Sequence, residues 1–203
     1  MATLIRLYSD FVCPFCFIAE QSSLARLQTE YDVELDWRGF ELNPRTPRGG
    51  VDMEQLFPGR AAGMRAHAAQ VAQRFGVTGI RLPLRLNNTR RALALAEWAR
   101  THGKLLEFRD AAMEAYWRQG ADLEDPQVLT RLAEQVGLPA EQASAAMDAP
   151  EYQSRVDELQ AEGRAAGVSG IPTFFIGNVR VVGCQPYEVF VEAARQAGAR
   201  RRS

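Results

Sequence analysis

The stretch SDFVCPFC, residues 9–16, places two thiols three residues apart directly after a short apolar run. Residues 4–8 alternate in the manner of a β-strand, and Ser9-Asp10 ends that run. From Pro14 onward apolar residues recur at helical spacing, and proline suits the first turn of a helix because its missing N–H is not needed there. The pattern therefore predicts a strand, a turn and a helix that begins at the cysteine pair.

The rest of the chain divides into a strand, a long helical block and a closing hairpin with a helix. Residues 33–40 alternate apolar with polar and predict a second strand beside the first, through a right-handed crossover. Strand periodicity returns at residues 170–182, where Gly177-Asn178 signals a two-residue hairpin, and Pro186 opens a last helix. Between them we expect helices at residues 53–75 with a break at Pro58-Gly59, 89–102, 105–118, 126–136, 140–147 and 152–166.

Bulk composition excludes several classes of function. Hydrophobic residues make up 46% of the 203 residues and charged residues 24%, as in ordinary globular proteins, and the net charge of -1 provides no field that would attract nucleic acid or a membrane. The N-terminal residues lack the features of a secretory signal and no stretch is long enough to span a bilayer, so we expect a cytoplasmic protein. Three cysteines in a reducing compartment favour redox or metal chemistry over a structural disulfide.

The two cysteines of the motif are expected to have different roles. Cys13 lies at a helix N-terminus, where unpaired N–H groups and the positive end of the helix dipole favour the thiolate. Cys16 is on the same side of the first turn and could attack a mixed disulfide formed on Cys13. The spacing thus predicts Cys13 as the nucleophile and Cys16 as the resolving thiol.

A zinc site is the alternative interpretation of the pair, with Cys184 and either His67 or His102 as further ligands. Structural zinc sites usually combine two close ligand pairs, whereas each histidine stands alone on its predicted helix. We therefore predict no metal at this motif.

Three segments together carry a specific resemblance. Residues 9–16, the segment Val168-Ser169-Gly170-Ile171-Pro172-Thr173-Phe174 and the later Gly183-Cys184-Gln185-Pro186 resemble the DsbA-type thioredoxin-fold oxidoreductases, most of all the FrnE-like branch, which is often labelled with polyketide biosynthesis. The resemblance implies an α/β thioredoxin-like domain formed by residues 1–48 and 168–203, interrupted by a large all-helical subdomain at residues 49–167. It also implies a cis bond at Ile171-Pro172 and substrate binding by the Ile171 backbone; a trans proline at a strand start is the alternative.

Three further residues are candidates for supporting roles. Glu20 projects from the face of the helix that carries Cys16 and could relay its proton, or it is a solvated helix charge. Cys184 lies at a turn that a thioredoxin fold brings near the motif; it could be a third redox thiol, although a small buried residue is the interpretation we favour. Phe15, within the motif, could contribute to a substrate groove.

The sequence thus favours a protein disulfide oxidoreductase that needs no metal or organic cofactor. Its partners would be thiol- or disulfide-containing proteins or small molecules, with glutathione as a candidate electron partner, and a homodimer is compatible with the sequence. The first alternative is a glutathione-dependent transferase or isomerase of the kappa or 2-hydroxychromene-2-carboxylate isomerase type, which resembles this chain but has serine at the nucleophile position and generally lacks the second cysteine. The second alternative is a non-catalytic binding module or chaperone that uses the cleft between the insertion and the core.

Overall fold

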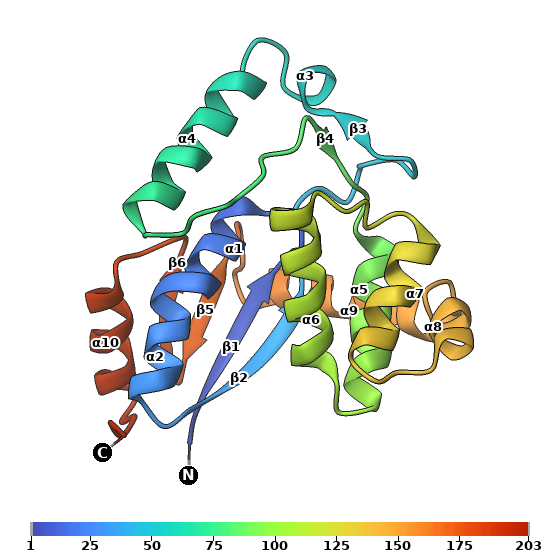
Figure 1. Ribbon diagram of the computed structural model, residues 1–203. Coiled ribbons are helices and arrows are strands. Elements are labelled where there is room, and N and C mark those ends of the chain that lie inside the picture. The colour runs from blue at the N-terminus through green and yellow to red at the C-terminus, as the bar shows by residue number, and fades with distance from the viewer. Residues whose placement is uncertain (1, 203) are drawn as a thin grey trace.

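A mixed four-stranded sheet forms the centre of the computed structural model, which describes residues 2–202 (Figure 1). The strand order is β2-β1-β5-β6; β1 and β2 are parallel, and the other neighbours are antiparallel. The four strands are β1 (Thr3–Ser9), β2 (Val33–Gly39), β5 (Thr173–Ile176) and β6 (Val179–Val182). Residues from the two ends of the chain therefore meet in one sheet, with β1 and β5 at its centre.

One nearly continuous helical rod connects β1 to β2, as parallel pairing requires. It consists of α1 (Pro14–Ala19), the π-helical segment η1 (Glu20–Leu24) and α2 (Ala25–Glu30). The closing helix α10 (Tyr187–Gln196) lies beside α2 (Figure 1). Pro14 occupies the first turn of α1, so the predicted strand, turn and helix are all present.

The long insertion contributes most of the helices. They are α3 (Met53–Leu56), α4 (Ala61–Arg74), α5 (Arg90–Thr101), α6 (Leu105–Glu114), the π-helical η2 (Ala115–Gln119), α7 (Pro126–Gln135), α8 (Ala140–Ala146) and α9 (Pro150–Ala165). The predicted break at Pro58-Gly59 lies between α3 and α4. None of the helices in residues 2–202 is long and apolar enough to cross a membrane.

The insertion shares one hydrophobic core with the sheet. Phe11, which follows β1, packs against Trp37 of β2 and against Phe108 of α6, with ring centroids 5.2 and 6.4 Å apart respectively. All three side chains are fully buried. Helix α6 of the insertion therefore rests directly on Phe11, which leads into the cysteine motif. The boundaries at residues 48 and 168 remain a prediction.

The prediction of an all-helical insertion is wrong in one detail. Residues Val51–Asp52 and Arg85–Leu86 form an antiparallel two-stranded ribbon, β3 and β4. Strands of two residues are too short to produce a recognisable alternation in sequence. The ribbon, α3 and α4 together form an arm, residues 51–86, and α4 packs on α1 (Figure 1).

Candidate redox site

Cys13 caps the helix that it precedes. Its backbone is extended, and its Sγ accepts the Cys16 N–H at 3.4 Å, as an N-cap side chain does. The Cys13 thiol also donates to the Ile171 carbonyl at 3.6 Å. Both contacts hold the sulfur at the positive end of α1, between the helix and the loop that precedes β5.

Cys16 is completely buried behind Cys13. Burial, with the Cys13 side chain and its charge beside it, raises the pKa of the Cys16 thiol well above its ordinary value. Cys16 therefore stays protonated at neutral pH. Both cysteines are free in this structure, and their roles as attacking and resolving thiols stay a prediction.

The proline loop lies directly against the cysteine motif. The Ile171-Pro172 peptide bond is cis, and the Ile171 carbonyl accepts the Cys13 thiol. Two hydrogen bonds fix the loop: Thr173 Oγ1 donates to the Gly170 carbonyl at 2.6 Å, and the Gly183 N–H donates to the Pro172 carbonyl at 2.8 Å. The Cys13 sulfur thus hydrogen-bonds to Ile171, a residue 158 positions later in the chain.

Asp10 is a buried carboxyl group beside the motif, where its sequence position suggested only a turn. Its carbonyl accepts the Cys13 N–H at 3.2 Å, and its Oδ2 accepts the Leu42 N–H at 2.6 Å. Burial raises the pKa of Asp10 to about 7. Asp10 therefore joins the cysteine loop to the segment that follows β2, and its charge changes near neutral pH.

Glu20 is buried, so the interpretation as a solvated helix charge is wrong. It accepts the Ser9 hydroxyl at 2.6 Å and forms an ion pair with Arg109 of α6, 89 residues away. Burial raises the pKa of Glu20, although Arg109 and Ser9 oppose that shift, and the negative charge of Glu20 contributes to the raised pKa of Cys16. The ion pair connects the redox helix to the insertion, and a proton-relay role for Glu20 stays a prediction.

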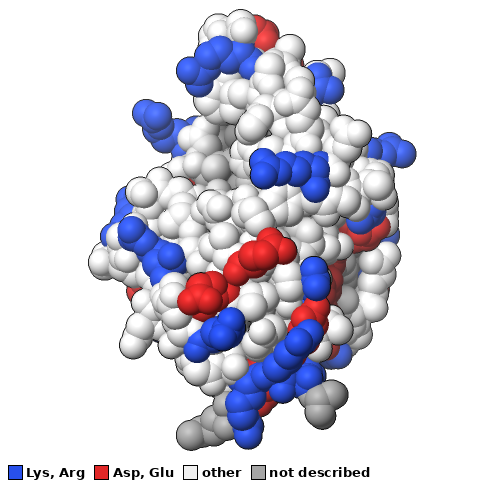
Figure 2. Space-filling model, turned by 90° about the vertical axis from the view of Figure 1, so that its left-hand side faces the viewer, with Lys and Arg blue, Asp and Glu red and all other residues white. Residues whose placement is uncertain are grey.

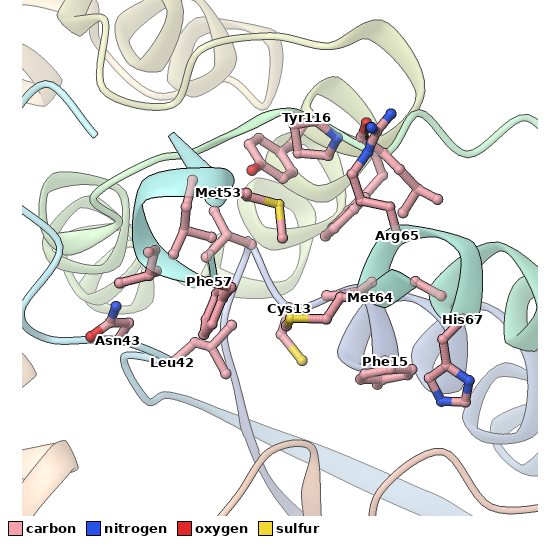
Figure 3. Close-up of a pocket in the computed structure, with 18 of the residues that line it drawn as sticks. Cys13, Phe15, Leu42, Asn43, Met53, Phe57, Met64, Arg65, His67 and Tyr116 are labelled. Carbon is pink, nitrogen blue, oxygen red and sulfur yellow. Dashed lines mark hydrogen bonds between the residues drawn. The ribbon is translucent and has the colours of Figure 1, made fainter. Parts of the chain in front are cut away.

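A cavity of about 670 Å³ opens above the cysteine motif. Cys13, Pro14, Phe15 and Ile171 form one side of it, and Tyr116 and Trp117 also contribute. Most of the remaining lining comes from the arm and the loop before it: Leu42, Asn43, Arg45, Met53, Leu56, Phe57, Met64, Arg65, His67, Ala68, Leu82, Pro83 and Leu86. Figure 3 shows Cys13 between the side chains of Met53 and Phe57 on one side and those of α4 on the other.

Comparison with known proteins identifies the family. Residues 4–195 match the model of the DSBA-like thioredoxin domain. The chain belongs to this DsbA-like family. The predicted thioredoxin-like α/β fold is confirmed.

Three similar proteins show how far the likeness extends. A probable DsbA oxidoreductase from Streptomyces coelicolor has a TM-score of 0.83 at 25% identity, covering 97% of this chain and 90% of that chain. A 2-hydroxychromene-2-carboxylate isomerase has a TM-score of 0.78 at 18% identity, covering 95% of each chain. The uncharacterized protein YwbO of Bacillus subtilis (strain 168) is 29% identical over 196 residues, 95% of this chain and 96% of that protein.

Cys184 of this DsbA-like chain is half-buried and packs against the main core. Burial, and the proximity of Cys13, raise the pKa of the Cys184 thiol to about 12. A thiol with this pKa has little thiolate at neutral pH and is a poor attacking group. The structure thus brings Cys184 near the motif, but its surroundings do not favour the reactive thiolate form.

The two histidines considered as zinc ligands lie in different places. His67 is exposed on α4 with its ring 5.7 Å from that of Phe15, whereas the His102 ring packs on Trp98, 4.6 Å away. Within residues 2–202 there is no group of three or more His, Cys, Asp or Glu side chains placed to hold a metal ion. His67 belongs to the DsbA-like cavity instead, beside Phe15.

Sequence reasoning missed the arm side of this cavity and the burial of Asp10. The arm residues follow no motif, and Asp10 is buried by contact with Leu42, which only the tertiary structure reveals. One signal was available in the sequence. Residues 55–96 contain seven arginines and no Asp or Glu, an unusual run for a chain of net charge -1.

Proposed function

We propose that this protein is a thiol-disulfide oxidoreductase in which Cys13 attacks and Cys16 resolves. The observation that carries the proposal is the asymmetric pair at the start of α1: Cys13 caps the helix at the cavity, and Cys16 is protonated and buried behind it. Membership of the DsbA-like family supports the same reaction class.

The reaction proceeds in two exchanges. The Cys13 thiolate attacks one sulfur of a substrate disulfide, the substrate S–S bond breaks, and one thiolate leaves. Cys16 then loses its proton and attacks the Cys13 sulfur of the mixed disulfide, which releases the second substrate thiolate and leaves a Cys13–Cys16 disulfide. The substrate gains the two electrons that the cysteine pair loses. The same steps in reverse oxidise a dithiol, and the direction depends on the reduction potentials of the two couples.

Several finer assignments belong to this proposal. Glutathione, as a cytoplasmic thiol, would serve as the electron partner, and the location proposed with it is the cytoplasm. The Ile171 backbone and Phe15 would contact the substrate, because both border the cavity beside Cys13. Assignment to the FrnE-like branch rests on the sequence resemblance alone.

The glutathione-dependent isomerase is the second candidate, and two observations favour it. The fold is similar to that of a 2-hydroxychromene-2-carboxylate isomerase, and the cavity is large enough for a small organic substrate. Cys16 argues against this candidate, because an isomerase that only activates glutathione has no need of a resolving thiol.

Oxidised glutathione provides the test. Mass spectrometry of the reduced protein after mixing should show a Cys13–Cys16 disulfide in the wild type and a glutathione adduct on Cys13 in the Cys16→Ser variant. The Cys13→Ser variant should form neither product. A wild-type protein that stays fully reduced at every glutathione ratio would contradict the proposal and favour the isomerase or a non-catalytic binding module.

A further inference from the structure

The Cys13 side chain is difficult to reach from outside the protein. Only 1% of the residue is exposed, although it borders the cavity. The arm, residues 51–86, covers that cavity, and α4 packs on the helix that begins at Cys13 (Figures 1 and 3). A disulfide on the surface of a folded protein would have to displace the arm to touch this sulfur. A small molecule that enters the cavity would not.

The cavity is suited in size and lining to a small apolar molecule. Ligand sites usually have volumes of about 300–1,000 Å³, and the cavity here has about 670 Å³. Its arm side presents mainly aliphatic, thioether and aromatic side chains, namely Met53, Leu56, Phe57, Met64, Leu82 and Leu86. Phe15 and Trp117 add aromatic surface from the other side.

The ionisable side chains that could attract a charged ligand to the cavity are basic. Arg45, Arg65 and His67 contribute to the lining, and none of the described lining residues is an Asp or Glu. Arg65 is half-buried on α4 and its Nε donates to the Leu82 carbonyl at 3.3 Å, so the arm itself holds the guanidinium. Arg65 belongs to the acid-free run at residues 55–96, and Figure 2 shows more basic than acidic side chains over α4. An anion is therefore favoured here and a cation disfavoured.

We propose that the substrate of Cys13 is a small apolar disulfide, or the corresponding thiol, that carries an anionic group such as a carboxylate. This inference rests on the proposed function and names the substrate class for the same site. The apolar body lies against the arm, the anion pairs with Arg65 or Arg45, and one sulfur lies against Cys13. Cys13 forms a mixed disulfide with that sulfur and expels the other as a thiolate; Cys16 then displaces the second thiolate and the cysteine pair becomes oxidised.

Single-turnover kinetics of the reduced protein test the charge and size preference. The probes are 5,5′-dithiobis(2-nitrobenzoate), which is aromatic and anionic, 4,4′-dithiodipyridine, which is aromatic and neutral, cystamine, which is cationic, and insulin as a protein disulfide. Each rate constant is divided by that of 2-mercaptoethanol, an uncharged thiol, with the same disulfide, which removes differences in intrinsic reactivity without adding a charge preference. The normalised constant should be largest for the aromatic anion, by about tenfold over the neutral aromatic probe and by more over cystamine and insulin.

Two substitutions on α4 distinguish a direct contact between Arg65 and the anion from the overall electrostatic field of the protein. Arg65→Gln should lower the preference for the anionic over the neutral aromatic probe by about tenfold, because an ion-paired hydrogen bond is lost. Arg74→Gln removes the same charge from α4 at an exposed position outside the cavity, and should leave that preference unchanged.

The outcomes distinguish this inference from the proposed function. Normalised constants that are equal for the anionic probe and cystamine, or highest for insulin, would overturn the substrate class while leaving the oxidoreductase intact. An equal loss of preference in Arg65→Gln and Arg74→Gln would overturn the direct contact with Arg65. No reaction of Cys13 with any of the four probes or with oxidised glutathione would overturn both proposals.

Discussion

The two sides of the cavity are built in different ways. The cysteine side consists of β1, α1 and the proline loop, where Cys13 is fixed by contacts to Asp10, Cys16 and Ile171 and surrounded by fully buried aromatic residues. The arm side consists of the two-residue strands, the four-residue helix α3 and the 14-residue helix α4, and α4 buries only Ala61, Ala68 and Ala72. The residues of the proposed reaction thus lie on a rigid framework, whereas the surface that would choose the substrate lies on a lightly packed arm, which can change without loss of the fold.

The largest expected difference between the two sides is in stability. Phe108→Ala removes a fully buried ring that packs on Phe11, so we expect the free energy of unfolding to fall by about 4 kcal/mol. Phe57→Ala removes a half-buried ring from the arm and should cost only about 1 kcal/mol, while it enlarges the cavity. Urea titration measures both values. Equal losses would contradict the view of the arm as lightly packed.

The buried Asp10 should make stability fall as pH rises. Its pKa is about 7 in the folded protein and near the ordinary 3.8 when unfolded, so between these values the folded state holds the extra proton. The contribution of Asp10 to stability is therefore greatest below about pH 4, decreases through this window by at most about 4 kcal/mol, and is constant above pH 7.

The Asp10→Asn variant isolates that contribution. Asparagine keeps an oxygen for the Leu42 N–H but does not titrate, so the variant should lack this part of the pH dependence and gain stability relative to the wild type from pH 4 to 7. Unfolding free energies at intervals of pH measure the difference. Parallel curves for the two proteins would show that Asp10 does not titrate in this range.

The sequence predicts the cysteine side of the cavity better than the arm side. The cysteine side was predictable because a local pattern, a strand followed by a proline-started helix, specifies its geometry within a dozen residues. The arm was not, because Val51–Asp52 pairs with Arg85–Leu86 through tertiary structure and has no periodicity of its own. The burial of Glu20 likewise depends on Arg109, a distant partner that spacing on one helix does not reveal.

Breaking the Glu20–Arg109 ion pair should cost stability because Arg109 would stay buried without the Glu20 carboxylate. Glu20→Gln leaves the Arg109 guanidinium buried beside a neutral group, and we expect a loss of about 2 kcal/mol. Adding Arg109→Gln should recover part of that loss, because it removes the buried guanidinium, which in Glu20→Gln keeps only the more exposed Asp110 as an ionic partner. The exposed pair Lys104–Glu107 is the matched control, and Glu107→Gln should cause no measurable change. Additive losses in the Glu20 and Arg109 double variant would contradict a direct coupling.

Replacing Cys184 should have the smallest effect of these substitutions. This residue lies on the cysteine side of the cavity, and we expect it to take no part in the disulfide exchange. Its thiol has a pKa of about 12, so it stays protonated at neutral pH and should not compete with Cys16 for the mixed disulfide on Cys13. Cys184→Ser should therefore form the Cys13–Cys16 disulfide at the wild-type rate. Alkylation of the oxidised native protein should label Cys184 slowly, because the residue is half-buried. A disulfide between Cys13 and Cys184 in the Cys16→Ser variant would instead make Cys184 a third redox thiol. The reactive residues on the cysteine side would then include the turn before α10.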